Sequence, residues 1–442
     1  GFGDAHPLDS VLARLIVISL IFLLSLSIIL FIILRQSKRE KQMEDDIFES
    51  IDCPSEDSGD LVNAELSELK DKLKQAIAAL SKSKPGRKSL YELPWYVMIG
   101  PPGAGKTTAI TQSGLNFPLI NSSGNKVSIG GVGGTRNCDW WFTNNAVLID
   151  TAGRYTTQDS DEGEDNAGWL GFLNLLKRHR MRQPINGVIL AVSLLELSLD
   201  DRSTQKVHAV AIRQRLNELR ERLGVRFPIY VLFTKSDLIA GFSEFYDNLG
   251  KEDREQVWGF TLPVTKKVKD GQSVIEPFDE EFNLILERLN SQLLERLQRE
   301  TNHQRRALIA TFPSQVASIR DTAKEFLDDV FQNNRFEKRH LLRGVYFTSG
   351  TQEGTPIDRL MVGMARTFGI GRQAIGNGHG KGRSFFLTRL FENVIFPESG
   401  LVGADDKVER RYHFFKYFGI ILALIFGVGM TTLWVRSYLG NA

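Results

Sequence analysis

The most hydrophobic parts of the sequence are two uncharged runs, one near each end. Residues 15–34 read LIVISLIFLLSLSIILFIIL, and residues 417–435 read YFGIILALIFGVGMTTLWV. A helix of about 20 such residues rises about 30 Å, the thickness of the hydrocarbon core of a bilayer. The first run is too long for the apolar part of a signal peptide, and no small-residue cleavage site follows it. The pattern therefore predicts two transmembrane helices.

Basic residues on the inner side of both runs predict their orientation. RQSKREK follows the first run and RRYHFFK precedes the second, whereas the outer flanks carry little charge. By the positive-inside rule, residues 35–416 face the cytoplasm, 1–14 form an extracytoplasmic loop and 436–442 begin a periplasmic region. The chain begins at Gly1 rather than Met, so we expect it to be a piece of a longer protein.

Between the two runs, the polarity pattern divides the chain into five segments. They are a charged linker (35–60), an amphipathic helix (61–84), an α/β domain (85–277), a helical subdomain (278–340) and a final strand with a C-terminal helical part (341–410). Apolar runs of strand length alternate with helical stretches, as in a mostly parallel sheet. The expected strands are 95–100, 138–143, 146–150, 187–193, 229–234 and 344–349.

Two local patterns refine this picture. Residues 138–150 read as a hairpin with an Asn-Asn turn, and alternation places Trp140 and Trp141 on opposite faces of the sheet. The helical stretches 279–300 and 314–332 lie between the last two strands. They are too long for one crossover, which predicts an inserted or appended subdomain.

Composition excludes several classes of function. The 55 Lys and Arg nearly balance the 53 Asp and Glu, which argues against a dedicated nucleic-acid partner. Two cysteines in unrelated contexts and seven scattered histidines form neither a disulfide framework nor the spacing of a metal site.

The strongest chemical motif is GPPGAGKT at 100–107, which follows the first strand and precedes a helix-compatible stretch. In a P-loop of this form, backbone amides cradle the β-phosphate, the lysine reaches the β- and γ-phosphates and the Thr hydroxyl binds Mg²⁺. A chance glycine-rich turn is the alternative, and the flanking strand and helix argue against it. The expected nucleotide contacts are Gly100, Gly103, Gly105, Lys106, Thr107 and Thr108.

A D-x-x-G tetrad follows the P-loop in sequence order. The strand at 146–150 ends on Asp150, whose carboxylate would hold Mg²⁺ through water, and the Gly153 amide could sense the γ-phosphate. Alone, the tetrad is a weak signal. Its position after a strand and after the P-loop makes it persuasive.

The third motif predicts selectivity for guanine. Thr234, Lys235 and Asp237 match the [NT]-K-x-D pattern, in which the carboxylate accepts hydrogen bonds from guanine N1–H and the 2-amino group. The lysine stem would cover the base. Ser349, in the TSG that follows the last strand, could belong to the loop that packs on guanine. Taken alone, 234–237 could also be a solvated turn, so GTP and ATP both stay open.

Two residues are candidates for catalysis. Thr135 lies where a GTPase switch threonine would cap Mg²⁺ and the γ-phosphate, although it could be an ordinary loop residue. Arg154 replaces the glutamine with which many GTPases orient water. It could stabilise transition-state charge or serve as a solvated switch residue. Slow hydrolysis of GTP or ATP is therefore an open possibility.

The chain also resembles the IcmF/TssM inner-membrane proteins of bacterial type VI secretion systems. The resemblance rests on GPPGAGKTT, GTRNCDWWF, LIDTAGRY, FTKSDLIAGF, RGVYFTSGTQEGTPIDRL and FENVIFPESGLVG, and it runs along essentially the whole chain. It implies an NTPase-like cytoplasmic domain between the second and third transmembrane helices. It also implies a core complex with an OmpA-like inner-membrane partner and an outer-membrane lipoprotein, contact with baseplate subunits and membrane lipid, and a homo-oligomer.

We therefore expect an α/β fold of the P-loop GTPase type with an added helical subdomain, flanked by two transmembrane helices. The leading hypothesis is an inner-membrane scaffold subunit that binds a nucleoside triphosphate as a switch. One alternative is a membrane GTPase or ATPase that drives transport by hydrolysis. The others are a vestigial domain that serves only for docking and an IcmF-type accessory of an Icm/Dot type IV system.

Overall fold

A computed structural model describes most of the central part of the chain. The described residues are 93–117, 138–157, 162–180, 183–264, 273–332, 339–350 and 383–404, with single positions at 429 and 432. The helix expected at 61–84, the run at 15–34, nearly all of the run at 417–435 and Thr135 lie outside these residues. Within the described part of the chain, no helix combines the length and the hydrophobicity that a membrane span requires.

The described residues form nine strands and a larger set of helices. The strands are β1 (Trp95–Ile99), β2 (Cys138–Phe142), β3 (Val147–Thr151), β4 (Gly187–Ser193), β5 (Val225–Arg226), β6 (Pro228–Thr234), β7 (Gly259–Thr261), β8 (Leu341–Phe347) and β9 (Gly403–Ala404). The α-helices are α3 (Lys106–Thr111), α4 (Arg154–Thr157), α5 (Glu162–His179), α6 (Leu194–Leu199), α7 (Arg202–Leu223), α8 (Phe242–Tyr246), α9 (Lys251–Arg254), α10 (Phe278–Arg299), α11 (His303–Ala317) and α12 (Arg320–Phe331). Three short turns of other helix types are η1 (Ser236–Leu238), η2 (Leu390–Ile395) and η3 (Pro397–Leu401).

The main sheet has seven strands in the order β2-β3-β1-β4-β6-β8-β7. The five inner strands run parallel, and β2 and β7 pair antiparallel at the two edges. The expected mostly parallel α/β fold and the hairpin at 138–150 are confirmed. Strand β7 was not predicted, because its three residues include a single apolar side chain and therefore show no periodicity.

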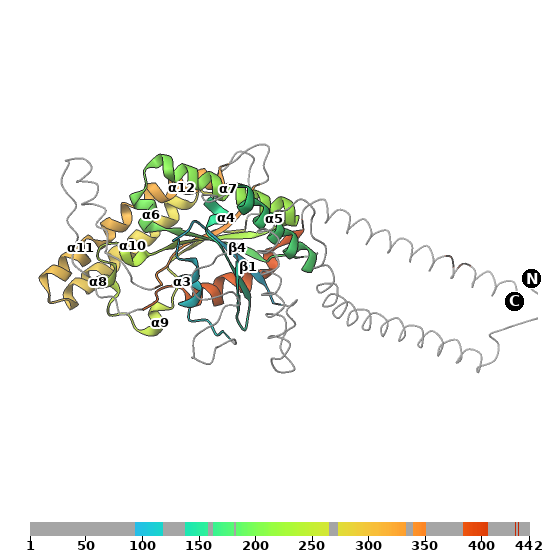
Figure 1. Ribbon diagram of the computed structural model, residues 1–442. Helices are drawn as coiled ribbons and strands as arrows, with labels where there is room; N and C mark the ends of the chain where they lie inside the picture. The colour runs from blue at the N-terminus through green and yellow to red at the C-terminus, as the bar shows by residue number, and fades with distance from the viewer. Residues whose placement is uncertain are drawn as a thin grey trace, which may run out of the picture. The chain divides into compact units, whose positions relative to one another are not determined.

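The two faces of the sheet have separate hydrophobic cores, which follow from the period of two along each strand. Trp95 and Val97 belong to the cluster that includes residues of α5, α7 and α12, whereas Tyr96 and Met98 belong to the cluster formed with α3 and residues 387–396. Figure 1 shows α7 and α12 on one side of the sheet and α3 on the other. Trp140 and Trp141 fall into different clusters, as the alternation predicted.

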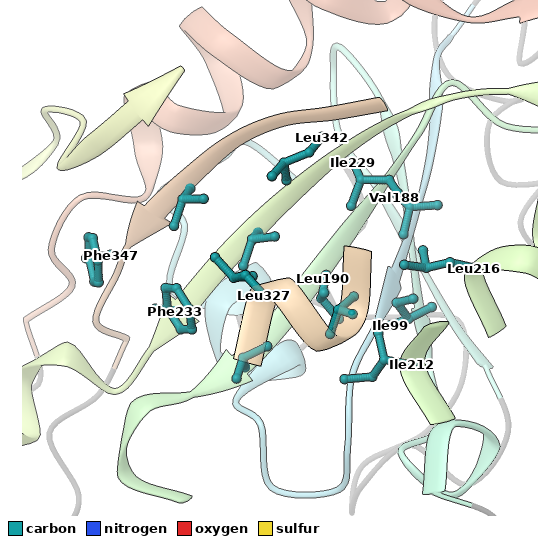
Figure 2. Packing of buried hydrophobic residues seen from close by; sticks show 14 of the residues in the cluster. Ile99, Val188, Leu190, Ile212, Leu216, Ile229, Phe233, Leu327, Leu342 and Phe347 are labelled. Carbon is teal, nitrogen blue, oxygen red and sulfur yellow. The ribbon is translucent and has the colours of Figure 1, made fainter. Parts of the chain in front are cut away.

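The helices of the predicted helical subdomain share the core of the sheet. Buried side chains of α10, α11 and α12, among them Phe282, Phe312 and Leu327, lie in the same cluster as Val188 and Ile99 of the sheet. Figure 2 shows Leu327 of α12 on the same side of the sheet as Ile212 and Leu216 of α7. Each fully buried side chain of this size stabilises the fold by about 1.5–3 kcal/mol.

The topology brings the predicted motifs to one edge of the sheet. Strand β1 lies between β3 and β4, so the chain leaves β1 toward one side of the sheet and later returns to its other side. In open α/β sheets, ligands bind at such a switch point, beyond the carboxyl ends of the strands. Met98 pairs with Asp150 in the β1–β3 register, so both strands end at the same level. The P-loop and Asp150 therefore meet at this edge.

Candidate functional site

The P-loop adopts a conformation that requires glycine. Gly103 and Gly105 have φ of 75° and 76°, in the left-handed region that favours glycine. A Cβ on Gly100 would lie 2.2 Å from the carbonyl oxygen of Ala191 in β4. The glycine spacing recognised in the sequence is therefore explained by the backbone path and by the close approach of β4.

Lys106 lies under this loop. Its side chain is 7% exposed, and Nζ donates hydrogen bonds to the carbonyl oxygens of Gly100 at 2.8 Å and Pro101 at 3.0 Å. Burial lowers the pKa of the Lys106 ammonium, while the negative charges of Asp150 and Glu196 oppose this shift. The lysine thus brings a buried positive charge to the loop.

Thr107 and Asp150 lie together beside the loop. The Thr107 hydroxyl donates a hydrogen bond to Oδ2 of Asp150, which is fully buried. Thr151 next to it donates from Oγ1 to the carbonyl oxygen of Met98 at 2.8 Å, which fixes the end of β3 against β1. A hydroxyl and a carboxylate at one point are oxygen ligands of the kind that Mg²⁺ prefers. These two residues therefore fit the magnesium role predicted for them.

The D-x-x-G turn packs directly on the P-loop. A Cβ on Gly153 would lie 2.4 Å from the backbone nitrogen of Pro102 and 2.5 Å from its Cα. Real Cβ atoms essentially never approach other atoms this closely. Gly153 therefore permits backbone contact between two motifs that are about fifty residues apart in the sequence.

A cavity of about 150 Å³ opens beside the P-loop, where guanine recognition was predicted. It is lined by Gly105, Thr108, Ala109, Thr234, Lys235, Asp237, Leu238, Thr348 and Gly350. These residues come from the P-loop and α3, from the end of β6 and the following η1, and from the loop after β8. The structure thus brings the first and third motifs and the TSG loop around a single cavity.

Asp237 places a buried carboxyl group at the wall of this cavity. Its side chain is 4% exposed, and Oδ1 has no hydrogen-bond partner among the described residues. Burial raises the pKa of the Asp237 carboxyl, while a hydrogen bond with Ser349 and the charge of Lys235 oppose the shift. Ser349 therefore contacts the acid, while its neighbours Thr348 and Gly350 line the cavity.

Thr234 and Lys235 join the cavity to the P-loop. The Thr234 hydroxyl donates to the carbonyl oxygens of Ala104 at 2.7 Å and Val192 at 3.3 Å. Lys235 has a φ of 57°, which is uncommon outside glycine, and its Nζ lies 3.1 Å from Oε1 of Glu196. The Thr234 hydroxyl therefore joins the end of β6 to the P-loop.

Of the two catalytic candidates, only Arg154 can be placed. It begins α4 and forms an ion pair of 3.2 Å with Asp165, which is 1% exposed, and its guanidinium lies 5.3 Å from the Tyr155 ring centre. The sequence did not predict this role of Asp165, because no local pattern distinguishes it from the other acidic residues of α5. A catalytic role for Arg154 stays a prediction, as does that of Thr135, which lies outside the described residues.

Glu196 is a second residue beside the site that the sequence analysis did not identify. It follows Ser193 by three residues, and Ser-x-x-Glu before an apolar stretch usually indicates a capping box. The Ser193 hydroxyl does accept from the Glu196 amide at 3.3 Å, which caps α6. The Glu196 carboxylate, however, extends to Lys235 and lies 3.0 Å from the Cβ position of Gly103.

The fold and the site define the class of this protein: an α/β protein built around a glycine-rich P-loop at the switch point of its sheet. Residues 162–423 match the IcmF-related N-terminal domain, so the chain belongs to the IcmF-related family. It is 51% identical over 383 residues to the type VI secretion system component TssM1 of Pseudomonas aeruginosa, a match that covers 85% of this chain and 34% of that relative. The family expected from the sequence blocks is confirmed, and the chain spans about a third of the relative's length.

Two solved structures show a more distant similarity. One is the signal recognition particle receptor SRβ–GTP/SRX complex from Chaetomium thermophilum, with 20% identity, a TM-score of 0.22, and coverage of 33% of this chain and 70% of that one. The other is an NFeoB variant from S. thermophilus bound to GDP, with 13% identity, a TM-score of 0.22, and coverage of 54% and 98%. With these scores, neither structure adds to what the sheet order and the loop geometry show.

Proposed function

We propose that this chain is an inner-membrane component of a type VI secretion system whose α/β domain binds GTP with Mg²⁺. The observation that carries the nucleotide proposal is the cavity of about 150 Å³ with the buried Asp237 carboxyl at its wall. A buried oxygen without a hydrogen-bond partner costs about 1–3 kcal/mol. The Oδ1 atom of Asp237 is such an oxygen within the described residues, and a ligand with N–H donors would satisfy it.

The phosphate end of the site also fits a nucleotide. Left-handed glycines at 103 and 105 turn the loop, Lys106 adds a buried positive charge, and Thr107 with Asp150 offers oxygen ligands for Mg²⁺. The bound cation would neutralise phosphate charge, and the protein would hold it through these two side chains. Opening of the two Lys106 hydrogen bonds to Gly100 and Pro101 would free the ammonium for phosphate oxygens.

Selectivity for guanine follows from the acceptor at the wall of the cavity. An ionised Asp237 accepts hydrogen bonds from N1–H and the 2-amino group of guanine, whereas adenine has no donors at the equivalent positions. Adenine would leave the buried acceptor unsatisfied, at a cost of about 1–3 kcal/mol, or roughly a 5- to 150-fold difference in affinity. Lys235 would cover the base with its stem.

Nucleotide binding by the purified chain tests this proposal. GTP and ATP are compared by titration with Mg²⁺, using wild type, Lys106→Ala and Asp237→Ala. We expect GTP to bind more tightly than ATP, Lys106→Ala to abolish binding of both and Asp237→Ala to remove the preference. Absence of binding by the wild type would refute the proposal and favour a P-loop fold that serves only for docking.

The role in secretion is proposed from the family and from the relative in Pseudomonas aeruginosa. In this role the chain lies in the inner membrane through the runs at 15–34 and 417–435, and residues 35–416 are cytoplasmic. Its proposed partners are an OmpA-like inner-membrane subunit, an outer-membrane lipoprotein, baseplate subunits and further copies of itself. Reporter fusions after residues 60 and 442 test the topology, because the two positions should report opposite sides of the membrane.

The rival function, a GTPase or ATPase that turns over, depends on Arg154. Its ion pair with the buried Asp165 directs the guanidinium toward α5, so a role at the γ-phosphate requires this pair to open. Phosphate release measured with wild type and Arg154→Ala separates the two functions. Turnover that is lost in the variant favours the enzyme, and tight binding without release favours the switch.

A further inference from the structure

We propose that Glu196 is a positioning residue of the base cavity, the cavity of about 150 Å³ beside the P-loop. The Glu196 carboxylate holds Lys235 in place. The Lys235 ammonium in turn neutralises the Glu196 carboxylate, which would otherwise repel the phosphates of the nucleotide. This inference rests on the proposed function, because it concerns the same nucleotide site.

Glu196 lies where the two ends of the site meet. Its Oε1 is 3.1 Å from Nζ of Lys235 and 3.0 Å from the position of a Cβ on Gly103 in the P-loop. The cap of α6 fixes its backbone, since the amide of Glu196 donates to Ser193, which is 1% exposed at the end of β4. One carboxylate therefore pairs with Lys235 of the base motif and lies next to Gly103 of the phosphate loop.

The ion pair explains how Lys235 keeps its conformation. Lys235 has a left-handed backbone, and its side chain is 30% exposed, so the long stem could turn toward solvent. The pair with Glu196 holds the ammonium toward the P-loop, and the stem then lies along the cavity that it lines. Fixing a long side chain before binding lowers the entropy cost of binding.

The charge of Glu196 has a second consequence. A carboxylate close to an anion site weakens phosphate binding unless a cation neutralises it. The negative charge of Glu196 is close enough to raise the pKa of Lys106, against the effect of burial. Within the described residues, Lys235 is the cation that forms an ion pair with it. Loss of Lys235 would therefore weaken binding twice, through the base and through the exposed negative charge.

Two ligands separate these effects in titrations of the purified chain. GTP tests both ends of the site, whereas tripolyphosphate with Mg²⁺ tests the phosphate end alone. We expect Glu196→Gln to weaken GTP binding about 5-fold, the size of a partly exposed ion pair, without weakening tripolyphosphate binding. We expect Lys235→Met to weaken both ligands, and Glu196→Gln added to Lys235→Met to restore tripolyphosphate binding to within about twofold of wild type.

Glu295→Gln is the matched control, because Glu295 forms an ion pair with Arg299 on α10 and does not line the cavity. It should change neither affinity. If wild type binds GTP and Glu196→Gln binds it equally well, or if the double variant shows no recovery, the role of Glu196 is refuted while the proposed function stands. If wild type binds neither ligand, the proposed function fails and this inference fails with it.

Discussion

Replacing Gly153 by alanine should loosen the contact between the D-x-x-G turn and the P-loop. The new Cβ would lie 2.4 Å from the nitrogen of Pro102, 2.5 Å from its Cα and 2.9 Å from its Cδ, all under the 3.0 Å that real Cβ atoms keep. The atoms in question belong to a backbone and a proline ring, which cannot rotate away. The two segments must therefore separate by about 0.6 Å.

The magnitude follows from two opposing terms. Overpacking of a well-packed contact lowers the free energy of unfolding by about 1–3 kcal/mol. Alanine has less conformational entropy than glycine in the unfolded chain, which raises the free energy of unfolding by about 0.4–1 kcal/mol. We therefore expect Gly153→Ala to lower the free energy of unfolding by about 1–2 kcal/mol. It should also weaken GTP binding, because Asp150 begins this turn three residues before Gly153, and its position beside Thr107 depends on the packing.

Urea denaturation followed by tryptophan fluorescence measures the change, because a loss of stability lowers the midpoint at constant slope. Gly400→Ala is the matched control: a Cβ there meets nothing within 4 Å, so we expect a change below about 0.5 kcal/mol. If Gly153→Ala and Gly400→Ala have the same midpoint, the D-x-x-G turn does not pack on Pro102 and the coupling between the two motifs is refuted.

Four further predictions concern the base cavity, the core and η3. Burial raises the pKa of Asp237, so the fraction of protonated Asp237 increases as the pH falls through that pKa. The affinity for GTP should therefore fall at acidic pH, whereas the affinity of Asp237→Asn should not change with pH in the same titration. In the absence of nucleotide, Asp237→Asn should raise the midpoint of urea unfolding at neutral pH, since a buried charge is removed. Phe242→Ala should cost about 3–5 kcal/mol in the same assay, because the ring is fully buried among five other aromatic rings. Glu398→Ala should lower the free energy of unfolding by about 3 kcal/mol, because Arg343 loses its bidentate partner and the Tyr230 hydroxyl loses an acceptor at 2.8 Å. A urea midpoint equal to that of wild type would contradict this prediction.

The central strands could be predicted because their burial is visible in the sequence. Strands β4 and β6 are buried along their whole length, so they appear as continuous apolar runs, and alternation correctly separated Trp140 from Trp141. Strand β7 could not be predicted, because an edge strand of three residues carries no periodicity and exists only through its pairing with β8.

The sequence by itself determined the motifs and their order, since glycine spacing and the residues that follow a strand are local properties. It placed Lys106, Thr107, Asp150 and Asp237 in the order that a P-loop nucleotide site requires. Only the tertiary structure decided what these motifs touch. The sheet order placed the carboxyl ends of β1, β3 and β6 at one edge, and the cavity, the contact of Gly153 with Pro102 and the pairing of Glu196 with Lys235 follow from that. Such contacts join residues about forty or more positions apart, and their partners are selected by packing, for which a local pattern carries no signal.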